Sequence, residues 1–336
     1  MHIKSILAAC CAVVIIQPGA ALAGSPEDGF RWLSQNEYIL REGVIWNDRF
    51  GDGRDRYKSG GLTQSWLIPE RRLTDMQWFE GRASGVEIQA RGFVATPDNT
   101  NGGGPPTDRP FVQFAGIGLY LRSLQRPVRL DHMTTQSVED RIGVEFGYQG
   151  DPLPFFDIQE SVHGNTAMNV NRNNSVGGEF LGNIEASRTW RIHYDFRSDD
   201  LEFAPFVQGS TGMRENSLRA GAELIYGTSL EGRTWNRDPA IGALIPGGSQ
   251  PRTGANWALW IGGDVGYVAS DAFLDGGFGR SGPSIAREEV TTRLRGGIML
   301  EFEDIAIAYS VTWLSPEFEG QPSGQMIGAA SLKYRF

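Results

Sequence analysis

Polar residues suited to catalysis are concentrated in the stretch NDRFGDGRDRYKSGG, residues 47–61. The pair Asn47 and Asp48 ends one apolar run, and Tyr57 and Lys58 begin the next. The loop between the runs is rich in Asp, Arg and Gly. Two interpretations are open from this pattern: a solvated hairpin loop, or one wall of an active site.

Histidine is the side chain whose charge changes most readily near neutral pH, and the chain has four. We expect His2 in a removed leader, His132 in a solvated turn and His193 in an inward-facing polar network. His163 lies in DIQESVHGNTAMN, within the longest expected loop, and long loops are often functional. Spacing alone leaves open whether His163 is solvated or catalytic.

Several catalytic signatures are absent from the sequence. It contains no G-x-S-x-G elbow, no H-E-x-x-H motif and no EF-hand loop. Both cysteines, Cys10 and Cys11, lie in the expected leader, which excludes thiol catalysis in the mature chain. A serine nucleophile stays possible, although no motif marks one.

The N-terminus predicts export. Residues 1–23 combine Lys4, an apolar run and the small residues of Ala21-Leu22-Ala23, which is typical of a secretory signal peptide cleaved near Ala23. We expect residues 24–336 to form one domain, and no segment there is apolar enough for a spanning helix. The net charge of −9 is unsuited to binding the phosphates of a nucleic acid, so no nucleic-acid partner is predicted.

Period-two alternation predicts a β protein of the outer membrane. Ile142, Val144 and Phe146 alternate with polar residues, and the C-terminal MIGAASLKYRF alternates up to Phe336. A membrane barrel turns its apolar face to lipid and its polar face to the lumen. We therefore predict an all-β fold, a single twelve-stranded antiparallel transmembrane barrel. The expected strands are 38–48, 57–69, 82–96, 110–123, 140–150, 187–198, 201–212, 217–229, 255–270, 288–303, 304–318 and 326–336.

This topology places the opening stretch at the outer rim. The external loops are expected at 49–56, 97–109, 151–186, 213–216, 271–287 and 319–325. The connection 230–254 is long for a periplasmic turn. Lumen arginines such as Arg219, Arg293 and Arg295 are expected to pair with acids such as Glu223 and Glu301.

Three short motifs in order resemble those of the outer-membrane lipid A 3'-O-deacylase family. They are Asn47-Asp48, then the segment from Asp55 to Gly60, then Gly147-Tyr148-Gln149-Gly150 followed by Gln159 and His163. The resemblance covers the whole mature chain and includes the strand number and the long connection after the eighth strand.

The resemblance implies a calcium-dependent carboxylic ester hydrolase that removes the 3' acyloxyacyl group of lipid A in lipopolysaccharide. His163 would be the general base for water, and Asn47 and Asp48 would hold Ca²⁺ near the oxyanion. Lys58 would assist at the oxyanion or a phosphate, and Arg54, Arg56 and Tyr57 would contact substrate. The site would lie at the outer leaflet of the bacterial outer membrane, in a monomer surrounded by lipid.

Two departures from the family pattern keep other functions open. Lys58 stands where the family has Thr or Ser, and adjacent Ser59 should face the opposite way in a regular strand. Asn169 stands near the position of an expected acid, which weakens the calcium prediction. The alternatives are a barrel of this fold acting on another lipid ester, or a non-catalytic small porin or surface-binding barrel.

Overall fold

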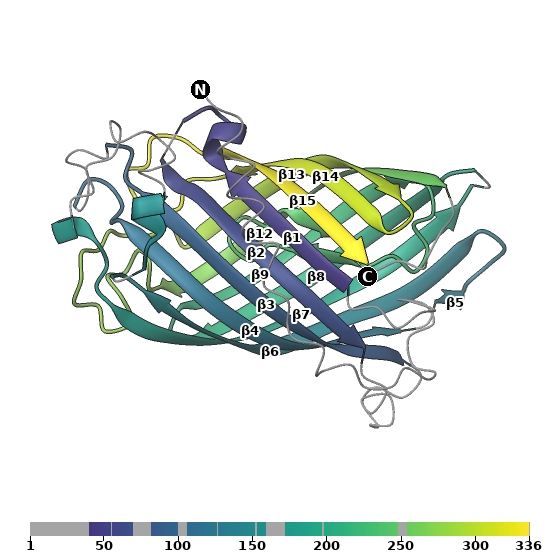
Figure 1. Ribbon diagram of the computed structural model, residues 1–336, viewed down its shortest axis with the longest axis horizontal. Helices are drawn as coiled ribbons and strands as arrows, with labels where there is room; N and C mark the ends of the chain where they lie inside the picture. The colour runs from purple at the N-terminus through teal and green to yellow at the C-terminus, as the bar shows by residue number, and fades with distance from the viewer. Residues whose placement is uncertain are drawn as a thin grey trace.

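The barrel is seen in a computed structural model that describes residues 40–54, 56–69, 82–99, 106–125, 127–151, 153–158, 172–196, 198–247 and 254–335. Twelve long antiparallel strands in these ranges form its wall (Figure 1). They are β1 (Leu40–Asn47), β2 (Tyr57–Pro69), β3 (Arg82–Thr96), β4 (Val112–Gln125), β6 (Thr134–Gln149), β7 (Glu179–Asp195), β8 (Asp200–Gly212), β9 (Glu215–Gly227), β12 (Ala255–Asp271), β13 (Val290–Phe302), β14 (Ile305–Leu314) and β15 (Gln325–Arg335). No helix of the described residues is long and apolar enough to cross a membrane.

The wall closes through hydrogen-bonded neighbours on both sides of every long strand. The order is β4-β3-β2-β1-β15-β14-β13-β12-β9-β8-β7-β6, and β4 pairs with β6 to complete the circle. The short β5 (Val128–Arg129) adds only to β6. The predicted fold, a closed twelve-stranded antiparallel barrel, is confirmed.

Side chains of the wall are sorted as a membrane barrel requires. Ile142, Val144 and Phe146 are exposed on the outside, whereas the lumen buries ionic groups. Arg295 pairs with Glu223 and with Asp264, and Arg219 and Arg293 share Asp264. Glu301 accepts from Arg233 and Lys333. The prediction of ion pairs in the lumen is therefore confirmed.

Two predicted strands were several residues too short at their start, and the predicted strand 304–318 was too long, since β14 ends at Leu314. β6 begins at Thr134 instead of 140, and β7 begins at Glu179 instead of 187. The two strands pair continuously from Thr134↔Tyr194 to Gln149↔Glu179. The polar 134–139 segment and Gly182 interrupt the apolar pattern, so both ends resembled loops. The third external loop is consequently shorter than the predicted 151–186.

The 230–254 connection, expected at the periplasmic side, turns into the lumen where the structure describes it. Its residues 230–247, here called the lumen hairpin, contain the paired β10 (Trp235–Arg237) and β11 (Leu244–Pro246). Asn236 donates to Glu42 of β1, and Asp238 accepts from Thr63 of β2 at 2.6 Å. The polar side chains of this segment enter the lumen because the ionic wall satisfies them there.

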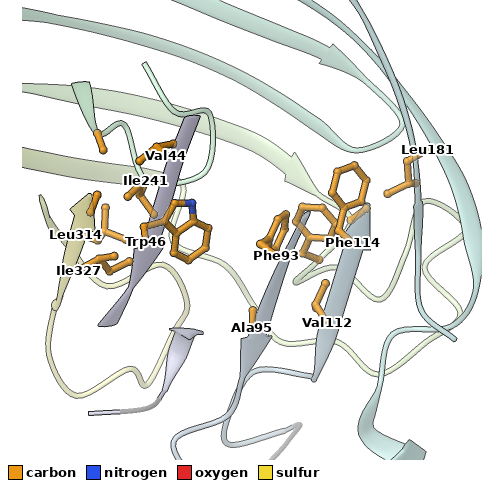
Figure 2. Packing of buried hydrophobic residues seen from close by; sticks show 14 of the residues in the cluster. Val44, Trp46, Phe93, Ala95, Val112, Phe114, Leu181, Ile241, Leu314 and Ile327 are labelled. Atoms are coloured by element: carbon orange, nitrogen blue, oxygen red, sulfur yellow. The ribbon is translucent and has the colours of Figure 1, made fainter. Parts of the chain in front are cut away.

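Apolar residues of the lumen hairpin also support β1. Ile241, Ala243 and Ile245 belong to one buried cluster with Val44 and Trp46. Figure 2 shows Ile241 beside Val44 and Trp46, with Leu314 and Ile327 of the neighbouring wall close by. Trp46 directly precedes Asn47, so the packing of the lumen reaches the predicted site.

Candidate functional site at the outer rim

Asn47 ends β1 and fixes the turn that follows it. Val44 and Trp46 face the lumen cluster, so alternation directs Asn47 to the outside of the wall. Its Oδ1 accepts the backbone N–H of Arg49 at 2.8 Å, which caps the short helix η2 (Asp48–Phe50). Its Nδ2 donates to the carbonyl of Ser59 at 2.6 Å. Asn47 therefore joins the first loop to β2.

Asp48 is fully buried beside Asn47. Its Oδ2 accepts the backbone N–H of Arg56 at 2.6 Å and lies 3.5 Å from Nε2 of Gln325. Its carbonyl accepts the N–H groups of Gly51 and Asp52 at 2.8 and 3.0 Å. The residue thus holds both ends of the first loop together.

A β-bulge at Ser59 decides which way the next side chains point. The pairing of β2 with β3 shifts between Lys58↔Ala95 and Gly60↔Val94, which leaves Ser59 as the extra residue. Ala95 belongs to the lumen cluster, so Lys58 points inward. Ser59 is fully buried, and its Oγ lies 2.6 Å from Oγ1 of Thr96.

The bulge overturns the facing argument drawn from the sequence. Regular alternation back from Gly60 would place Ser59 in the lumen and Lys58 outside. The extra residue reverses this, because Thr96 faces away from the lumen cluster that contains Ala95. A hydroxyl, and not the Lys58 ammonium, therefore stands on the same side as Asn47.

Lys58 belongs to an ionic group at the mouth of the lumen. Its Nζ contacts Oε1 of Glu317, whose Oε2 lies 3.8 Å from Arg109. Burial raises the pKa of Glu317, but Lys58 and Arg109 outweigh it and hold the pKa below its usual range. Burial also lowers the pKa of Arg109, against the attraction of Glu317. Lys58 is thus turned away from Asn47.

The predicted substrate-binding residues occupy different environments. Arg54 is exposed to solvent, and its N–H donates to Asp52 at 3.1 Å. Arg56 is buried and its guanidinium lies 5.0 Å from the centre of the Tyr57 ring. Tyr57, at φ 56°, is buried with its ring edge-to-face with Phe318. Of these three residues, Arg54 alone has an accessible side chain.

The third external loop begins on the outside of the wall, close to the end of β3 that carries Thr96. Phe155 fills the space beside Gly92, where a Cβ would lie 2.7 Å from the ring. Phe156 packs with Phe111 and with Val94, the neighbour of Ala95 and Thr96 on β3. The described part of this loop stops at Ile158 and resumes at Arg172. His163, Gln159 and Asn169 lie outside the described residues.

The base of the third loop is fastened by the predicted G-x-x-G motif. Gly150 has φ 89°, and a Cβ there would lie 2.8 Å from the N of Gly178. Gln149 donates to Glu179 at 2.6 Å. Both contacts join the two ends of the loop, so the motif defines where the loop leaves the wall.

Sequence reasoning missed Thr96 and Gln325. Gln325 is buried and bonds the backbone of both Arg56 and Lys58. Its partner Lys58 is 267 positions away in the chain. No local spacing could indicate such a contact, although closure of the predicted barrel would have placed the last strand beside the first.

The described residues do not by themselves make a calcium site. They contain no group of three or more His, Cys, Asp or Glu side chains able to hold a metal. Oδ1 of Asn47 and Oδ2 of Asp48 each accept a backbone N–H, whereas Ca²⁺ takes about six to eight oxygen ligands. No chemical step is therefore assigned to calcium here.

Comparison with known proteins gives the chain a family. A family model described as "Outer membrane protein LpxR" matches residues 6–336. The solved structure of LpxR from Salmonella typhimurium is similar in fold, with a TM-score of 0.69 at 16% identity, covering 88% of this chain and 100% of that one. An outer-membrane channel from Pseudomonas putida F1 gives a TM-score of 0.46 at 10% identity, covering 96% and 100%. No curated protein matches in sequence.

Proposed function

Because the chain belongs to the LpxR family of outer-membrane proteins, which bears out the family predicted from the sequence, we propose that it is a lipid A deacylase. It hydrolyses the 3'-linked acyloxyacyl ester of lipid A. The observation that carries the proposal is the position of Asn47 and Ser59 on the outside of the wall at its outer rim. A lipid of the outer leaflet would meet the wall at this rim.

The outer face beside this group suits acyl chains. On β14 and β15, Ile307, Tyr309 and Met326 are exposed, and Tyr309 donates to the carbonyl of Phe50 at 2.8 Å. Apolar side chains and the rim turn are thus joined on one surface. Substrate enters from the bilayer, with its chains along the wall and its sugar at the rim.

In the proposed reaction His163 acts as general base. It takes a proton from water, whose oxygen attacks the ester carbonyl carbon. The bond between that carbon and the 3' oxygen of the sugar then breaks, the acyl group leaves as a carboxylic acid, and the proton passes to the sugar oxygen. Asn47 and Asp48 hold the rim in the geometry that receives the ester, and Ser59 supplies a hydroxyl on that side.

Three further parts of the proposal come from the family resemblance. Calcium dependence is one, and substrate contact by Arg54, Arg56 and Tyr57 is another. The third is Lys58 as a partner of the oxyanion or a phosphate. Lys58 contacts Glu317, and this ion pair supports a structural role for Lys58 at the mouth of the lumen.

Mass spectrometry of lipid A tests the proposal. The purified barrel in detergent is incubated with lipid A, with calcium or with a chelator, beside the variants His163→Ala and His132→Ala. His132 is the matched control because it is exposed in a turn away from the rim. We expect loss of one acyloxyacyl unit with the wild type and His132→Ala, and none with His163→Ala. Unchanged lipid A from folded wild-type barrel would refute the proposal.

A further inference from the structure

Gln325, the first residue of β15, stands where the backbone pairing of the rim has a gap. β1 pairs with β2 as far as Asn47↔Gly60 and with β15 as far as Asn47↔Gly328. The chain then turns into η2 at Asp48, so residues 56–58 have no strand β1 beside them. Backbone groups at such an edge need other partners when they are buried.

The Gln325 amide supplies those partners in the way a strand would. Its Oε1 accepts the N–H of Lys58 at 3.2 Å, and its Nε2 donates to the carbonyl of Lys58 at 3.2 Å and to that of Arg56. A primary amide has one acceptor and two donors, so it can copy both sides of a peptide group. Gln325 is 1% exposed, which keeps water from replacing these bonds.

The same amide reaches the carboxylate of the candidate site. Nε2 lies 3.5 Å from Oδ2 of Asp48, the atom that accepts the N–H of Arg56. Lys58 directly precedes the bulge residue Ser59. Gln325 is therefore in contact with the residues on both sides of the rim turn.

We propose that Gln325 is a positioning residue, which sets the orientation of the Asp48 carboxylate and the register of the Ser59 bulge for ester hydrolysis. This inference rests on the proposed function. Gln325 touches no reacting atom, so its loss acts through misplacement of Asn47, Asp48 and Ser59. Misplacement by about 1 Å costs on the order of 100-fold in rate.

Kinetics of Gln325→Ala and Gln325→Glu test this role. In Gln325→Glu a carboxylate would meet Asp48 and the carbonyls of Arg56 and Lys58, all of them acceptors. We expect kcat to fall about 10- to 100-fold in both variants, with KM within about twofold. Gln89→Ala is the control, because Gln89 is equally buried and hydrogen-bonded but contacts Ser65 and Glu87 in the lumen. We expect it to keep wild-type kcat.

Amide hydrogen exchange separates this inference from the proposed function. The N–H of Lys58 should exchange about tenfold faster in Gln325→Ala, because it loses its acceptor, and Gln89→Ala should leave it unchanged. Unaltered exchange, or faster exchange with unaltered kcat, would overturn the positioning role. An inactive wild-type barrel would refute the proposed function and the catalytic part of the role, and protection at Lys58 would then still report the Gln325 contact.

Discussion

Replacement of Asp48 tests whether its charge or only its shape is needed at the rim. Asp48→Asn keeps an oxygen that can accept the N–H of Arg56, whereas Asp48→Ala removes the acceptor altogether. Because Asp48 is fully buried and its Oδ2 lies 2.6 Å from the Arg56 nitrogen, water cannot readily take its place.

The expected stability losses follow from these contacts. Hydrogen bonds to charged groups contribute about 1.5–3 kcal/mol and neutral ones about 1 kcal/mol. Asp48→Asn should therefore lower the free energy of unfolding by about 0.5–2 kcal/mol. Asp48→Ala also leaves the Arg56 N–H without its acceptor and should cost about 2–4 kcal/mol. The order is wild type, then Asp48→Asn, then Asp48→Ala.

Two assays separate the effects. Denaturant unfolding in lipid vesicles gives stability, and release of the acyloxyacyl acid gives activity. We expect both variants to lose at least about 100-fold in kcat/KM, equivalent to about 2.7 kcal/mol, because the Asp48 carboxylate holds the rim turn that receives the ester. Near-wild-type activity of Asp48→Asn would show that the charge is dispensable. Wild-type stability of Asp48→Ala would refute the hydrogen-bond reasoning.

Three other predictions concern the wall, the lumen and the mouth. Gly61→Ala should lower the free energy of unfolding by about 1–3 kcal/mol, because its Cβ would lie 2.3 Å from the Trp46 ring. Thermal unfolding compares it with the control Gly43→Ala, where the atom nearest to the new Cβ is 3.9 Å away. Equal stability of the two variants would contradict the prediction. The wild-type barrel should give no steady ion conductance in planar bilayers. Replacing residues 231–247 by a short Gly-Ser linker should open a conducting path, because Asn236 and Asp238 of this segment bridge to the wall. A conducting wild type would favour the porin alternative. Because the pKa of Glu317 is lowered in the fold, its pairing with Lys58 should stabilise the mouth above about pH 4.5 and be lost as pH falls further. In the wild type, the rate of proteolysis of loop 315–324 should then rise only at acid pH. In Glu317→Gln it should be raised at neutral pH as well. Equal cleavage rates of the wild type at pH 7 and pH 3, within about twofold, would count against the pairing.

Strands with a clear apolar face were predictable, and those without one were not. β2 and β3 were predicted to the residue because period-two alternation runs through most of each strand. Nearly the first half of β7 was missed because Gly182 weakens its apolar face, although Phe180 and Ile184 are exposed there. Lipid contact leaves a period-two record in sequence, whereas lumen contact tolerates many residue types. The lumen hairpin illustrates this, since nothing in its composition indicates which wall its side chains bind.

The candidate site was predictable only where its parts are close in sequence. Asn47 and Asp48 were identified from their place at the end of a strand, and the structure joins Asn47 to Ser59 of β2 and Asp48 to Arg56 just before β2. The Ser59 bulge was not predictable, because an extra residue changes the facing without a change in alternation. Gln325 was missed because its role depends on the closure of the barrel, which brings the last strand beside the first.

The position of the proposed site explains why a filled lumen is compatible with hydrolysis of a lipid. Asn47 stands at the end of β1, a strand of eight residues, and strand ends fray readily. Here β1 pairs with β2 on one side and with β15 on the other. From within the lumen, Asn236 donates a hydrogen bond to Glu42, and Ile241 belongs to the same apolar cluster as Trp46. A substrate that arrives from the bilayer needs only the outer face of that strand. The lumen is then free to be packed, and the packing holds the outer face in place for catalysis.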